Sequence, residues 1–215
     1  MGFLLSIYVG VVAIVMVASV ARGDPLVPML CVFGDSVVDV GNNNHLNTLI
    51  KSNFPPYGRD FVTHTPTGRF CNGKLATDFT AEYLGFDSYP PAYLSQDAKG
   101  KNLSIGANFA SAGSGFYDRT AQAISLTQQL AYYKEYQNKV VSMVGKDSAN
   151  TMFSGGIHLL SAGSSDFIQN YYINPMLQRT YTPDQFPGLK VVVFDIYQPL
   201  LDLITKPTDQ GMKEE

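Results

Sequence analysis

Short apolar segments alternate along the chain with stretches that carry a helical or a polar pattern. Residues 74–84 and 125–144 have the spacing of helices, and in the second helix Leu126, Leu130, Tyr133, Val140 and Val144 recur at near-helical intervals. Apolar runs predict a buried strand at Leu26–Phe33 and further strands at Ile105–Ala110, Ile157–Ser161 and Val191–Tyr197. Strands that alternate with helices predict an α/β fold with a mainly parallel sheet covered on both faces.

The first residues predict a secretory signal. Phe3–Val20 is almost wholly apolar, and small residues follow at the spacing that a signal peptidase needs. We therefore expect a cleaved signal at residues 1–23, a secreted protein, and one domain over residues 24–215. No basic residue precedes the apolar run, and its length also suits a membrane anchor, so an uncleaved anchor is the alternative. After cleavage no membrane span is expected.

Composition limits the possible partners. The 215 residues are 45% hydrophobic and 15% charged, which is enough apolar content to bury one sizeable core. The net charge is −3 and no long run of Lys or Arg occurs, which argues against nucleic acid as a partner. No Cys/His cluster has the spacing of a metal site and no phosphate-binding loop is complete, so neither metal nor cofactor is expected.

Two further features depend on secretion. An exported chain can carry a glycan at Asn102, because Asn102-Leu103-Ser104 is an acceptor sequence in a polar stretch. Cys31 and Cys71 are the two cysteines of the chain. Since Cys31 lies within a predicted buried strand, two buried thiols are favoured over a disulfide.

Three turns rich in Gly and Ser each follow a predicted strand: Gly34-Asp35-Ser36, Ala112–Gly115 and Gly163–Asp166. The carboxyl ends of parallel strands meet at one edge of a sheet, so these turns are expected to lie together. A serine at a strand-to-helix turn exposes its hydroxyl, and Gly113 brings a backbone N–H close to a developing oxyanion. One such tripeptide is usually an ordinary turn. Three in this order favour a serine hydrolase site.

These segments resemble the plant GDSL esterase/lipase family of the SGNH hydrolases. Phe33–Ser36 with Asp39 and Gly41–Asn44 is similar to its first sequence block, and Gly106–Gly115 to its second. Ser161–Phe167 is similar to its third block. Further matches are Pro55–Gly58, Thr67–Phe70 and Asn72-Gly73. The resemblance covers Val27 to about Phe186.

The resemblance implies a three-layer α/β/α fold and a secreted hydrolase of small-molecule esters or lipids, with no statement of oligomeric state. It implies that Ser36 is the nucleophile and Gly113 an oxyanion donor. The third block normally supplies an Asn side chain as a second donor, and Ser165 holds that place here. A hydroxyl still donates one hydrogen bond but has a shorter reach, and losing such a donor costs ~3 kcal/mol of barrier. Activity is therefore expected to be lowered rather than abolished.

The family's catalytic acid and base, an Asp-x-x-His motif near the carboxyl terminus, have no counterpart in residues 1–215. The three histidines are His45, His64 and His158, and none has a carboxylate three residues before it. His158 lies within a predicted strand and is expected to pack in the core, whereas His45 and His64 lie on polar loops. A serine hydroxyl without a base in hydrogen-bond reach is a poor nucleophile.

The same resemblance predicts a shortened chain. Thr182–Gln185 is a good helix start, but Pro187-Gly188 ends that helix after about one turn. We expect an internal deletion near residues 186–187 and an end before the Asp-x-x-His block. Such a loss exposes apolar surface and an unpaired strand edge, so marginal stability is expected. Two functions follow: a secreted ester hydrolase or, alternatively, a catalytically inactive truncated isoform or gene-model fragment that at most binds ligands.

Overall fold

The computed structural model describes residues 23–120, 123–173, 175–180 and 205. The chain divides into two compact units, Met1–Asn174 and Pro175–Glu215. In the second unit the described part is helix α5 (Pro175–Thr180) and Thr205. The predicted signal, the helix start at Thr182–Gln185 and the predicted strand Val191–Tyr197 lie outside the described residues. All elements that follow belong to the first unit.

Two parallel strands form the centre of this unit. β1 (Leu30–Gly34) pairs with β2 (Ile157–Ser161), with Leu30 opposite Ile157 and Gly34 opposite Ser161. A third parallel segment lies on the other side of β1, where Asn108 forms a bridge with Val32. The parallel arrangement and the strand at Ile157–Ser161 are therefore confirmed.

The predicted strand at Ile105–Ala110 was wrong in its extent. Its first residue ends a 3₁₀ helix, η2 (Gly100–Ile105), and Gly106 has a φ of 106°, so extended backbone begins after it. The ladder ends early because Asn108 Oδ1 accepts a hydrogen bond from the Ala110 N–H at 3.0 Å. The segment thus pairs with β1 through a single bridge and its flanking hydrogen bonds.

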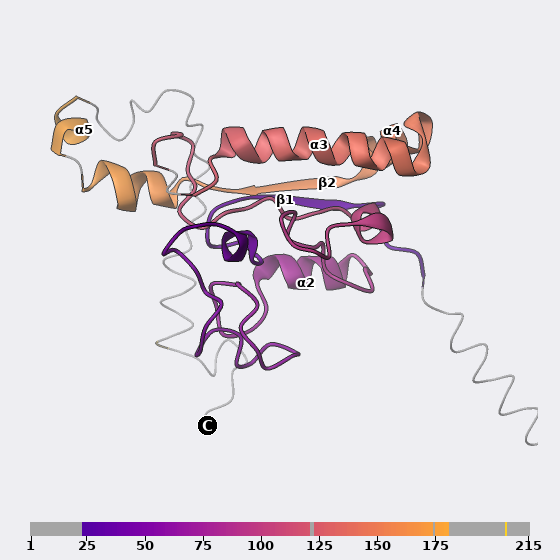
Figure 1. The fold of residues 1–215 in the computed structure, drawn as a ribbon, viewed down its shortest axis with the longest axis horizontal. Coiled ribbons are helices and arrows are strands. Elements are labelled where there is room, and N and C mark those ends of the chain that lie inside the picture. The colour runs from indigo at the N-terminus through magenta and orange to yellow at the C-terminus, as the bar shows by residue number, and fades with distance from the viewer. Residues whose placement is uncertain (1–22, 121–122, 174, 181–204, 206–215) are drawn as a thin grey trace, which may run out of the picture. The chain divides into compact units, whose positions relative to one another are not determined.

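Helices cover the sheet on both faces. Figure 1 shows α3 (Leu126–Val144) and α4 (Lys146–Gly155) above the strands and α2 (Ala76–Tyr83) below them. Alternate residues of the sheet segments enter the two cores. The core on the α3 side contains Met29, Cys31, Phe109, Tyr136 and Val140. The core on the α2 side contains Leu30, Val32, Ala81, Phe86 and Ala110. This is an incomplete three-layer α/β/α arrangement, as predicted.

Local chemistry sets the helix ends. α3 begins after Ser125, whose Oγ accepts a hydrogen bond from the Gln128 N–H at 3.2 Å, and it ends at Gly145, which has a φ of 81°. α2 begins after Leu75, whose N–H is taken by Asp78 Oδ2 at 2.8 Å. α4 was not predicted from the sequence, because it is short and has few apolar residues, and it buries only Ala149.

Both cysteines are free thiols. Cys31 is fully buried, and burial raises the pKa of its thiol to about 12. Cys71 is half-buried and its Sγ lies 3.0 Å from the Gly73 carbonyl oxygen. The interpretation of two thiols rather than a disulfide is confirmed. Among the helices that the structure describes, none is long and apolar enough to cross a membrane.

Candidate active site

The chain turns sharply at the end of β1. Gly34 has a φ of 137°, and a Cβ there would lie 1.9 Å from the Ser161 carbonyl oxygen, so no other residue fits this position without a shift. Asp35 Oδ1 accepts the Val37 N–H at 3.1 Å, and the Asp35 carbonyl oxygen accepts the Asp39 N–H at 3.1 Å. Ser36 lies in this turn and is half-buried.

Hydrogen bonds join the three predicted turns at one edge of the sheet. The Ser111 N–H donates to the Gly34 carbonyl oxygen at 3.0 Å, which connects the second turn to the first. The Asp35 N–H donates to the Ser161 carbonyl oxygen at 3.0 Å. The Ser164 hydroxyl donates to Asp35 Oδ2 at 2.7 Å, which connects the third turn to the first. Residues that lie 129 positions apart in the sequence are thereby held together.

Asp39 fastens the first turn to the second. Its carboxylate is fully buried and accepts backbone N–H groups from Gly41 (2.8 Å), Asn42 (2.9 Å) and Ala112 (3.0 Å). Desolvation raises the pKa of Asp39 to about 6, and these N–H groups oppose the rise. Asp39 therefore has a structural role in which its carboxylate pairs backbone groups of the first two turns.

Two buried asparagines complete this connection. Asn42 Nδ2 donates to the carbonyl oxygens of Asn108 (2.9 Å) and Ala110 (2.8 Å). Asn43 Nδ2 donates to the Ala112 carbonyl oxygen at 3.1 Å, and its Oδ1 accepts the Ser111 hydroxyl at 2.6 Å. The sequence analysis places both residues in the first block but assigns them no role. A run of Asn close to a Gly-Asp-Ser turn could have indicated it, because backbone groups in such a turn need hydrogen-bond partners.

Asp166 fastens the third turn to the loop that follows the second. Its carboxylate accepts the N–H groups of Phe116 (2.7 Å) and Tyr117 (3.0 Å) and the Thr120 hydroxyl (2.9 Å). A Cβ on Gly115 would lie 2.4 Å from Asp166 Oδ1, so the glycine is needed for this close approach. Figure 1 shows this loop at the end of the strands, near the start of α3.

The two predicted oxyanion residues lie in these connected turns. Gly113 is buried and has a φ of 84°, a backbone conformation that suits glycine. Ser165 is 4% exposed. Within the described ranges, the hydroxyls of Ser36 and Ser165 have no hydrogen-bond partner in the protein.

No histidine is hydrogen-bonded to Ser36 in the part of the chain that the structure describes. His158 is exposed, contrary to the expectation of a core residue. Among the described residues β2 pairs with β1 on one side only, and His158 Nε2 lies 2.6 Å from the Tyr133 hydroxyl of α3. Desolvation lowers the pKa of His158. His45 and His64 are exposed on loops, as predicted, and His64 Nδ1 lies 2.8 Å from the Arg59 carbonyl oxygen.

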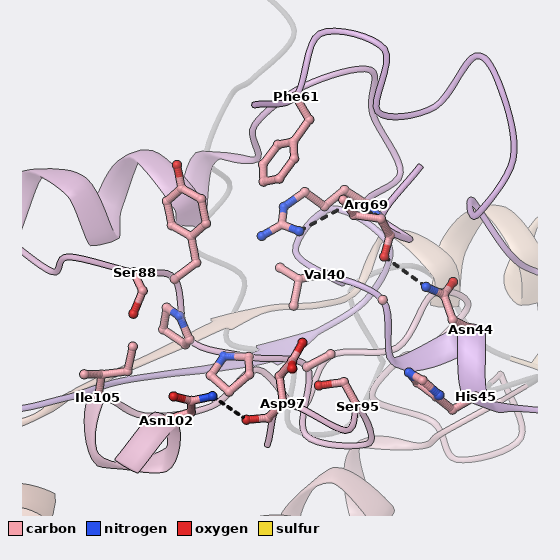
Figure 2. A pocket seen from close by; sticks show the side chains of 16 residues that line it. Val40, Asn44, His45, Phe61, Arg69, Ser88, Ser95, Asp97, Asn102 and Ile105 are labelled. Carbon is pink, nitrogen blue, oxygen red and sulfur yellow. Dashed lines mark hydrogen bonds between the residues drawn. The ribbon is translucent and has the colours of Figure 1, made fainter. Parts of the chain in front are cut away.

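A separate pocket of about 380 Å³ lies beside the loop that follows the first turn (Figure 2). Arg69 points into it, with its guanidinium 4.5 Å from the Phe61 ring centre, and Nη2 and Nε bind Asp78 of α2 at 2.7 and 2.8 Å. Ser36, Gly113 and Ser165 do not line this pocket. The Arg69–Asp78 pair holds the loop against α2.

Two other sequence predictions concern modification and metals. Asn102 is exposed in η2, and its Nδ2 donates to the Asp97 carbonyl oxygen at 3.0 Å. In the described ranges, no three His, Cys, Asp or Glu side chains gather in a way that could hold a metal ion.

Comparison with known proteins identifies relatives of this chain. The model of the protein family described as "GDSL-like Lipase/Acylhydrolase" matches residues 30–190. A GDSL esterase/lipase of Arabidopsis thaliana is 64% identical, and the alignment covers 92% of this chain and 78% of the relative. The GDSL esterase/lipase APG of the same plant is 54% identical over 88% of this chain and 75% of its own length. A third Arabidopsis GDSL esterase/lipase is 61% identical over 83% of this chain and 51% of its own length.

Proposed function

Since the chain belongs to the GDSL-like lipase/acylhydrolase family, we propose that it hydrolyses carboxylic esters of small molecules or lipids with Ser36 as the nucleophile. The observation that supports this role is the connection of the three turns through Gly34, Asp35 and Asp39. These bonds hold the turns that contain Ser36, Gly113 and Ser165 at the edge of the sheet where the parallel strands end.

The chemistry follows from these groups. Ser36 Oγ attacks the ester carbonyl carbon and loses its proton to a base, while the carbonyl oxygen becomes an oxyanion. The oxyanion accepts hydrogen bonds from the N–H groups of Ser36 and Gly113 and from the Ser165 hydroxyl. The intermediate collapses, the alcohol leaves with the proton, and water then hydrolyses the acyl-Ser36 ester to the free acid.

The direct test is ester hydrolysis by the purified chain. We expect release of p-nitrophenol from p-nitrophenyl esters, and Ser36→Ala to lower the rate by about a thousandfold or more. The matched control is Ser154→Ala, which removes an exposed hydroxyl from α4 and is expected to leave the rate unchanged. Equal rates for Ser36→Ala and the unchanged chain would contradict the proposal.

The positions of the histidines favour a second candidate function, binding of ester or acyl ligands without turnover. None of the three is bonded to Ser36 within the described residues, and a serine without a base reacts slowly. A folded chain that binds a fatty acid, measured by calorimetry, and releases no p-nitrophenol would support this function and contradict the first.

We also propose that the protein is secreted after cleavage at residues 1–23, is glycosylated at Asn102, and lacks an internal segment near residues 186–187. The exposure of Asn102 supports the glycan.

The alignment with the 64% identical relative runs over 276 positions, more than the 215 residues of this chain, so it contains gaps on the side of this chain. This supports an internal shortening. Sequencing the messenger across the Phe186–Pro187 junction tests the deletion, and an endoglycosidase mobility shift lost in Asn102→Gln tests the glycan.

A further inference from the structure

Gln129 connects helix α3 to the turn that holds Ser36. It lies in the first turns of the helix and is fully buried. Its Oε1 accepts the Gly34 N–H at 2.9 Å, and its Nε2 donates to the Gly34 carbonyl oxygen at 2.9 Å. One side-chain amide thus forms hydrogen bonds with both the N–H and the carbonyl oxygen of Gly34. Gly34 lies 95 positions away in the sequence and two residues before Ser36.

The same amide reaches the second turn. Gln129 Nε2 also lies 3.0 Å from Ser114 Oγ, to which it donates, and Ser114 follows the proposed oxyanion residue Gly113. The side chain therefore bonds to the turn of the nucleophile and to the turn of the oxyanion donor at once. Ser111 N–H, which also donates to the Gly34 carbonyl oxygen, strengthens the same junction.

Packing alone does not explain a glutamine at this position. α3 also buries Tyr136 and Val140, which fill the core beneath the helix. A buried amide is costly unless its polar atoms are paired, and an apolar side chain of the same length would leave the Gly34 N–H without its acceptor. The glutamine is therefore needed for its polar partners, which belong to two of the turns of the site.

We propose that Gln129 is a positioning residue for ester hydrolysis, because it fixes the place of Ser36 relative to the Gly113 N–H. The proposal rests on the proposed function. Reacting groups must be held in a near-attack geometry, and a displacement of about 1 Å costs about a hundredfold in rate. Gln129 itself touches no reacting atom and acts through Gly34 and Ser114.

The test uses Gln129→Met, which keeps the length of the side chain and removes its amide. A fluorophosphonate probe gives three quantities: the rate constant of the covalent step, the probe concentration at half-maximal rate, and the fraction labelled at completion. We expect the covalent rate constant to fall about a hundredfold, with the other two quantities unchanged within twofold. Gln128→Met, a change at the exposed neighbouring position, is the matched control and should label like the unchanged chain.

Two labelling results would overturn the proposal. One is an unchanged covalent rate constant in Gln129→Met. The other is a lower labelled fraction with an unchanged rate constant, which would show that Gln129 supports folding without positioning Ser36. If Gln129→Met does not fold, Gln129→Glu takes its place, since it keeps the Oε1 acceptor for Gly34 and loses the amide donor. It should then show the lower covalent rate constant.

Hydrogen exchange separates this proposal from the proposed function. Gln129→Met removes the acceptor of the Gly34 N–H, so this amide should exchange at least about tenfold faster in the native state. The Val32 N–H, which donates to the Ala107 carbonyl oxygen, should not change. A chain that no probe labels would contradict the proposed function alone. Unchanged exchange at Gly34 would overturn the role of Gln129 whether or not the chain is labelled.

Discussion

At the scale of single residues, buried polar side chains carry most of the connections around Ser36. Asp39, Asn42 and Asn43 are each at most 1% exposed and bind backbone groups of the second block. A buried polar atom without a partner costs about 1–3 kcal/mol. The loop after Ser36 is therefore held by bonds that are expensive to break.

Asp39 makes stability depend on pH in a defined window. Its pKa is raised from 3.8 to about 6 by desolvation, so the folded state binds the proton more tightly than the unfolded state. The stability from this proton is fully present below pH 3.8 and is lost as the pH rises through about 6. Against Asp39→Asn, which does not titrate, the unchanged chain should lose about 2 kcal/mol of unfolding free energy between pH 4 and pH 7.

Urea unfolding of both proteins at each pH measures this difference, and the titration of all other groups cancels in the comparison. A difference that stays constant across the window would show that the three backbone N–H groups hold the pKa of Asp39 near its ordinary value.

Ser165 offers a test of the proposed oxyanion site by gain of activity. Its hydroxyl has no protein partner in the described ranges and is shorter than the Asn that the family pattern predicts. Ser165→Asn should raise the rate of p-nitrophenyl ester hydrolysis about tenfold, and Ser165→Ala should lower it by a similar factor. Equal rates for all three chains would remove Ser165 from the proposed oxyanion site.

The sequence indicates the places of some of these side chains and not of others. Ser36, Gly113 and Ser165 follow apolar strands in chain order, so their placement at one sheet edge could be expected. Gln129 could not be found this way, because its partners Gly34 and Ser114 are distant in sequence and the helix pattern treats its position as one more buried residue. The prediction that His158 is buried was wrong, because the apolar pattern of a strand does not show which of its side chains are exposed.

At the scale of elements, the β1–β2 pair depends on one glycine. A methyl group on Gly34 would meet the Ser161 backbone at 1.9 Å in a conformation with a φ of 137°. Gly34→Ala should therefore lower the unfolding free energy by about 3 kcal/mol or more. Gly73→Ala is the matched control, because its nearest contact would be an ordinary 3.7 Å. Similar urea midpoints for the two variants would contradict this account of the turn.

The loop at residues 116–120 depends on Asp166 in the same way. Asp166→Ala removes the acceptor of the Phe116 and Tyr117 N–H groups, so both amides should exchange at least about tenfold faster. Asp118→Ala, in the same loop, removes one exposed hydrogen bond from Thr127 and should leave both amides unchanged. Equal exchange in the two variants would show that the loop is held by other contacts.

Elements with strong patterns were the predictable ones. Ile157–Ser161 and the helix at 125–144 agree closely with the observed bounds, since a short apolar strand and a long amphipathic helix are set by the local pattern. The extent of the strand at 105–110 could not be predicted, because the Asn108 side chain accepts the Ala110 N–H and ends the strand pairing. This contact depends on the tertiary structure. α4 could not be predicted, because few of its residues are apolar.

At the scale of the whole molecule, apolar side chains lie exposed near the end of the first unit. Leu160 of β2 is 52% exposed, and Ile168 and Ile173 are 64% and 70% exposed. Exposed apolar surface next to a strand favours association. The shortening near residues 186–187 and the marginal stability of the chain stay predictions.

Fluorophosphonate labelling of the purified chain tests the claim that Ser36 is a nucleophile, because such probes react with an activated serine. We expect covalent labelling of the unchanged chain at Ser36, located by peptide mass spectrometry, and none in Ser36→Ala. A chain that is folded by circular dichroism and takes up no label would contradict the claim and leave ligand binding without turnover as its function.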